Sequence, residues 1–67
     1  MSEARQMTIV LDQHMKMLEV GAEGRDRDGQ IAYWREIITH AENIEGWFGP
    51  AVASRAKGHI KRLEAEK

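Results

Sequence analysis

The sequence predicts an all-α protein, a single domain of three helices, and three observations support this fold. The chain has 67 residues, which is enough for only one domain, residues 1–67. Two glycine-containing segments, residues 21–29 and 46–50, divide it into three stretches. In each stretch apolar residues recur every three or four positions, as on an amphipathic helix, and none alternates strictly as a strand does. We therefore expect helices at about residues 2–20, 28–45 and 50–64.

The first predicted helix begins at Ser2, a residue type that accepts a hydrogen bond as an N-cap. At roughly 100° per residue, one face of the helix gathers apolar side chains: Ala4, Met7, Leu11, Met15 and Leu18. Val10 and Met17 lie beside that face, whereas Ile9 and Val20 point nearly the opposite way. The helix therefore carries more apolar surface than one neighbouring helix would cover.

The second predicted helix contains the largest apolar side chains of the chain. Asp28 is expected to cap its start, and Gly46 to adopt the left-handed conformation that ends many helices. Its broad apolar face consists of Trp34, Ile37, Ile38, Ala41 and Ile44, and Phe48 continues it. We expect this helix to supply most of the core.

The third predicted helix begins at Pro50, where the missing N–H of proline costs nothing. Its apolar face is thin and is made of Val52, Ala53, Ala56, Ile60 and Leu63. Short loops make sequential helices neighbours, so we expect a hairpin of the first two helices with a shorter third helix packed across it. The alternative is a long two-helix unit that dimerises into a bundle, with the third helix as an arm.

The small size of the chain favours self-association. A domain this short buries a modest share of its apolar surface, and the absence of cysteine excludes disulfides and thiolate zinc sites as reinforcement. We therefore expect a homodimer: a non-enzymatic interaction module that also binds a partner protein through apolar and aromatic helix surface. Exposed aromatic and methionine side chains often anchor such contacts. The predicted partner-binding residues are Ile9, Met17, Val20, Tyr33 and Trp47.

The charge distribution leaves a second interpretation open. The formal net charge is -1, but residues 1–49 have five basic against nine acidic residues, whereas residues 50–67 have five against two. The basic third helix could contact nucleic-acid phosphates, or it could pair with the acidic body of its own or a neighbouring chain. The alternative function is therefore a small nucleic-acid-binding regulator. Its phosphate contacts would be Arg55, Lys57, Lys61 and Arg62.

The sequence contains no complete motif for catalysis or for a cofactor. His14, His40 and His59 fall on three different predicted helices, so a metal or pH-responsive site would require them to converge in the fold. The loop from Gly24 matches part of a calcium-binding EF-hand, but Gly24 and Arg35 stand where carboxylates are needed. We expect no enzymatic activity, no cofactor and no metal.

The first residues do not combine a basic region with an apolar stretch, so no signal peptide is expected. No apolar run approaches the roughly 18 residues that span a bilayer. We therefore expect a cytoplasmic protein with no membrane contact.

Overall fold

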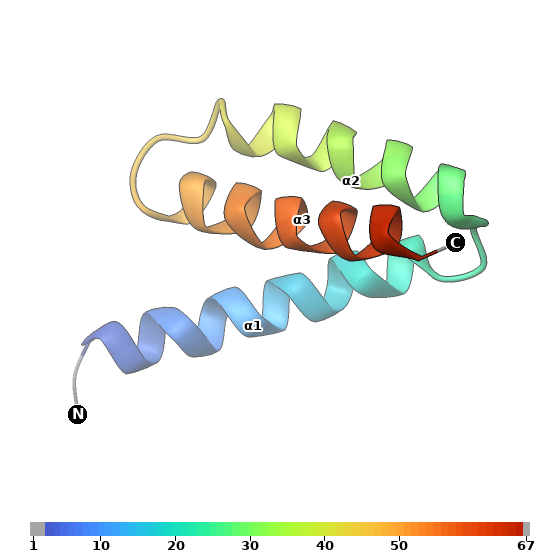
Figure 1. Ribbon diagram of the computed structural model, residues 1–67. Coiled ribbons are helices and arrows are strands. Elements are labelled where there is room, and N and C mark those ends of the chain that lie inside the picture. The colour runs from blue at the N-terminus through green and yellow to red at the C-terminus, as the bar shows by residue number, and fades with distance from the viewer. Residues whose placement is uncertain (1–2, 67) are drawn as a thin grey trace.

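A computed structural model of the chain describes the backbone of residues 3–66 and the side chains of residues 5–66. It contains three helices: α1 (Glu3–Ala22), α2 (Arg27–Ala41) and α3 (Phe48–Ala65) (Figure 1). Residues 3–66 form no strand, and the all-α prediction is confirmed. The predicted N-cap Ser2 and the side chain of Ala4 lie outside the described residues.

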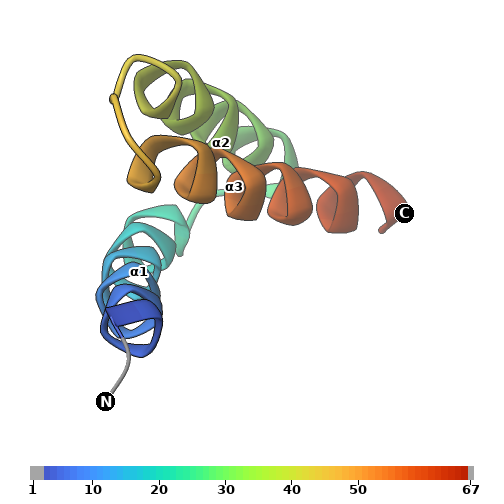
Figure 2. The same ribbon diagram turned by 90° about the vertical axis from the view of Figure 1, so that its left-hand side faces the viewer.

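The hairpin is formed by α2 and α3, which run antiparallel along one another, and α1 packs across them (Figures 1 and 2). The predicted hairpin of the first two helices therefore differs from the structure. The third helix is also not shorter than the second, because α3 has 18 residues and α2 has 15. Gly49 explains the close approach: its backbone lies against the carbonyl oxygens of Ala41 and Ile44 and leaves no room for a Cβ.

Several helix ends differ from the predicted ones. α1 runs two residues further than predicted, to Ala22, and α3 begins at Phe48, two residues before Pro50. Phe48 therefore belongs to α3 and does not continue the second helix. Asp26, not Asp28, caps α2, because its carboxylate accepts a hydrogen bond from the Gly29 backbone N–H at 2.7 Å. α2 ends at Ala41, about one turn earlier than predicted, where the chain begins to turn toward α3. Gly46 does adopt the expected positive φ of 89°, but within this loop rather than at the helix end.

The core lies where the three helices meet and centres on Trp34, which is 2% exposed. The buried apolar side chains are Leu11, Met15, Ala22, Ile31, Trp34, Ala41, Val52, Ala53 and Ala56. The predicted core face of α3 is confirmed, with Ile60 and Leu63 partly buried beside it. Ile44 was predicted on the apolar face of the second helix, but it follows the helix end and is exposed. Among the described residues, α3 contributes as many buried apolar side chains as α2 does, which the sequence did not predict.

Candidate functional site

One side of α1 presents apolar side chains to solvent. The exposed fraction rises from 47% at Ile9 to 74% at Met17, and Val10 and Val20 lie between these values. We call these four residues the outer face of α1. At 100° per residue they lie about 100–180° around the helix from the buried Leu11. Figure 2 shows the α2–α3 hairpin on one side of α1. Large apolar side chains gathered on one surface are typical of an interaction site.

A groove joins the outer face to the aromatic corner between α2 and α3. Gln6, Met7, Val10 and Trp47 line it, and its volume is about 420 Å³. Trp47 is 43% exposed, and its ring meets Phe48 edge to face with centroids 5.3 Å apart. We call this depression the Trp47 groove. Because Val10 belongs to both, the groove and the outer face form one continuous apolar surface.

Tyr33 was also predicted to bind a partner, but its side chain lies between α1 and α2. Its hydroxyl donates a hydrogen bond to the Leu18 carbonyl oxygen at 2.8 Å, and its ring is half-buried. The Arg25 guanidinium lies 4.9 Å above the ring centroid, and Gly21 leaves no room for a Cβ beside the hydroxyl. Tyr33 therefore links α2 to α1 through this hydrogen bond. The other predicted partner-binding residues are exposed: Ile9, Met17, Val20 and Trp47. The sequence prediction omitted Val10, although its position roughly 100° from the centre of the core face could have identified it.

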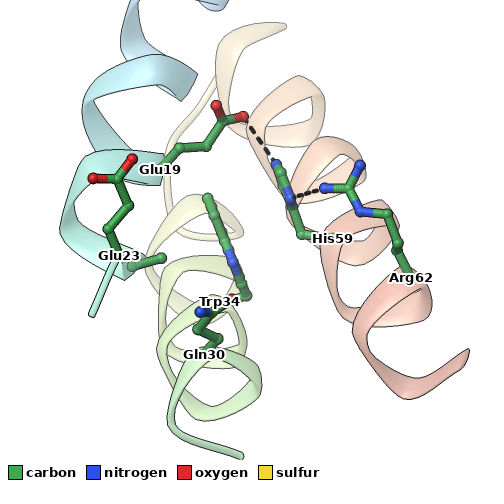
Figure 3. A pocket seen from close by; sticks show the side chains of 7 residues that line it. Glu19, Glu23, Gln30, Trp34, His59 and Arg62 are labelled. Atoms are coloured by element: carbon green, nitrogen blue, oxygen red, sulfur yellow. Dashed lines mark hydrogen bonds and ion pairs between the residues drawn. The ribbon is translucent and has the colours of Figure 1, made fainter. Parts of the chain in front are cut away.

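A polar cleft lies on the opposite flank of α1, centred on His59 (Figure 3). The His59 ring stacks on Trp34 with centroids 4.3 Å apart and an interplanar angle of 4°. Arg62 Nη2 donates to His59 Nδ1 at 2.6 Å, and His59 Nε2 lies 3.1 Å from Glu19 Oε2. A guanidinium can only donate, so Nδ1 accepts. With Nδ1 as acceptor, the ring proton is on Nε2, which donates a hydrogen bond to Glu19 Oε2.

The residues that line this cleft come from all three helices and bond to one another. The cleft has a volume of about 230 Å³, and two further depressions that also border His59 and Arg62 have volumes of about 410 Å³ each. Both nitrogens of His59 already have partners within the chain. Glu19 belongs to α1, Trp34 to α2, and His59 and Arg62 to α3, so the stacked and hydrogen-bonded group ties all three helices together.

The three histidines have separate surroundings. His14 meets the Phe48 ring edge to face with centroids 5.1 Å apart. His40 is exposed, and its Nε2 lies 3.9 Å from Glu36 one turn earlier on α2. Across the residues that the structure describes, no three His, Cys, Asp or Glu side chains are grouped so that they could hold a metal ion.

The predicted phosphate-binding residues of α3 divide into two kinds. Arg55 forms an ion pair with Asp12 of α1 at 3.1 Å, and Arg62 is bonded to His59. Lys57 and Lys61 are exposed on α3. Arg55 therefore holds α3 to α1, whereas the bond from Arg62 to His59 lies within α3. A phosphate would have to compete with both contacts.

Comparison of the chain with known family models, with curated proteins and with solved structures finds no match. None of the helices in the described part of the chain is long and apolar enough to cross a membrane. Among the sites described above, the outer face of α1 together with the Trp47 groove has the most exposed large apolar side chains.

Proposed function

We propose that this chain is a non-enzymatic helical interaction protein that self-associates as a dimer and binds partner proteins through the outer face of α1 and the Trp47 groove. The observation that carries the proposal is the continuous exposure of Ile9, Val10, Met17, Val20 and Trp47. Full burial of an aliphatic or methionine side chain contributes about 1.5–3 kcal/mol, so removing this surface from water favours association substantially.

The rest of the molecule is consistent with a binding role. The two ring nitrogens of His59 already have partners within the chain, Glu19 on α1 and Arg62 on α3. A short chain gains stability by burying surface in an oligomer that it cannot bury alone. We further propose a cytoplasmic location, which suits the cysteine-free composition.

The test is the mass of the protein in solution as a function of concentration, measured by sedimentation equilibrium. We expect the wild-type chain to shift from monomer to dimer as concentration rises, and Met17→Glu to shift it back toward monomer, because a carboxylate would be buried in the contact. Ala32→Glu is the matched control, since it adds the same charge to an exposed position of α2. A wild-type chain that stays monomeric up to about 1 mM would reject self-association.

The nucleic-acid alternative has a distinct signature. Phosphate binding by α3 would weaken steeply as salt concentration rises, and Lys57→Ala with Lys61→Ala would reduce it. Because Arg55 and Arg62 already have partners within the chain, we expect no such binding to duplex DNA at physiological salt.

A further inference from the structure

We infer that the outer face of α1 binds the same face of a second copy with the two helices antiparallel, about a two-fold axis that passes beside Gln13. This inference rests on the proposed self-association and adds its geometry. Because the second copy then covers the surface proposed for partner proteins, dimerisation and partner binding compete. Gln13 is exposed, and it lies at the middle of a stripe that runs from Gln6 to Val20. Fifteen helical residues extend about 22 Å, which is sufficient for a seam of four turns.

The spacing of the stripe is symmetric about Gln13. Ile9 and Met17 lie four residues on either side of it, and Gln6 and Val20 lie seven residues on either side. In an antiparallel pair centred on Gln13, Ile9 of each copy therefore faces Met17 of the other. All these residues fall within an arc of roughly 100° on the helix, so one contact can cover them together.

Charges along one edge of the stripe favour this orientation. Arg5, Asp12, Lys16 and Glu23 lie on the edge nearest α3. An antiparallel two-fold axis brings this edge against the same edge of the second copy. Along the helix axis, Arg5 of one copy then lies within about 3 Å of Glu23 of the other. Lys16 lies equally near the level of Asp12, whose carboxylate is already paired with Arg55 of its own chain, so the Arg5–Glu23 pair carries the charge argument. In a parallel pair the charged edge would instead face the other edge, where His14 and Met7 offer no opposite charge.

The Trp47 groove lies on that other edge and fits the same orientation. The most exposed apolar side chain of the outer face is Met17, and the antiparallel register brings it to the level of Val10 on the second copy. Val10 lines the groove together with Gln6, Met7 and Trp47. A flexible methionine packs well into an irregular apolar groove beside an aromatic ring. A parallel pair would place the charged edge over this groove.

Cysteine cross-linking tests the geometry directly, because the chain has no cysteine of its own. With helix axes about 10 Å apart, two facing Cα atoms come within disulfide range. Under mild oxidation we expect Gln13→Cys to form a disulfide-linked dimer with itself. Gln6→Cys should link to a chain carrying Val20→Cys at least about tenfold more than to itself, because association raises the effective concentration of the facing thiols.

Glu36→Cys, on the exposed side of α2, reports random collisions. Cross-linking of Gln13→Cys no faster than that of Glu36→Cys would overturn the inference. Self-linking of Gln6→Cys without linkage to Val20→Cys would also overturn it, by indicating a parallel pair, while self-association would stand. A wild-type chain that remains monomeric would instead overturn the proposed function, so the two failures are distinguishable.

Discussion

His59 stacks face to face on Trp34, with their ring centroids 4.3 Å apart, at the point where α3 meets α2 and α1. The stack covers one face of the largest buried side chain with a ring that also bonds Glu19 and Arg62. His59 therefore covers this end of the core, while both nitrogens of its ring keep hydrogen-bond partners.

The first prediction concerns His59 itself. His59→Ala removes the stacked ring and the bond to Glu19, and we expect the free energy of unfolding to fall by about 1–3 kcal/mol. Urea unfolding followed by circular dichroism measures this change. His40→Ala is the control, because His40 is exposed and makes only a 3.9 Å contact, so its change should stay within about 0.5 kcal/mol. Equal effects of the two variants would contradict the structural role of the stack.

The two tryptophans are expected to respond in opposite ways. Trp34 is 2% exposed, so Trp34→Ala should cost about 3–5 kcal/mol and leave a chain of this size largely unfolded. Trp47 is 43% exposed, so Trp47→Ala should change the unfolding free energy of the monomer by less than about 1 kcal/mol. The same Trp47 variant should weaken dimerisation at least about tenfold, because Trp47 lines the groove. Sedimentation equilibrium together with urea unfolding measures both quantities, and unchanged dimerisation would exclude Trp47 from the interface.

Two glycines of α3 provide a third comparison. Gly49→Ala places a methyl group against the carbonyls of Ala41 and Ile44, and we expect a loss of about 1–3 kcal/mol as the hairpin opens. Gly58 has open space around it, so Gly58→Ala should instead stabilise the helix by about 0.5–1 kcal/mol. Thermal unfolding of the two variants beside the wild-type chain gives the sign of each change. A stabilising Gly49→Ala would show that α2 and α3 are farther apart than described.

The fourth prediction concerns the proposed pairing of Arg5 with Glu23 of the second copy in the antiparallel dimer. Arg5→Glu should weaken dimerisation by about two- to fivefold for each pair that it breaks, and adding Glu23→Arg should restore the affinity. Arg5 and Glu23 are eighteen residues apart along the same chain, so a rescue has to arise between copies. Arg35→Glu on α2 serves as the control and should leave the dimer unchanged. Sedimentation velocity at low and high salt measures the effect, and a double variant no tighter than Arg5→Glu alone would contradict the register.

Much of the core could be predicted from the spacing of apolar residues. Leu11 and Met15 on α1 and Val52 on α3 lie on predicted faces and are buried. The helix pairing could not be predicted in this way, because it depends on how closely two helices can approach. That approach is set by Gly49 against Ala41, a contact between residues that periodicity treats separately.

The partner-binding role of the candidate site stays a prediction, but the exposure of its residues can be compared with their positions in the sequence. Ile9, Met17, Val20 and Trp47 are exposed as their positions suggested, whereas Tyr33 is drawn inward by the Leu18 carbonyl that accepts its hydroxyl. The sequence placed His59 on the third predicted helix, but its stack on Trp34 joins residues twenty-five positions apart and could not be predicted from local spacing.

By itself, the sequence determined that the chain forms three helices and which face of each one is apolar, because helix formation and amphipathicity follow from local spacing. Only the tertiary structure decided that α2 and α3 form the hairpin, that His59 closes the core over Trp34, and that one side of α1 stays uncovered. These features depend on close approach and hydrogen bonding between distant residues, which local spacing does not encode.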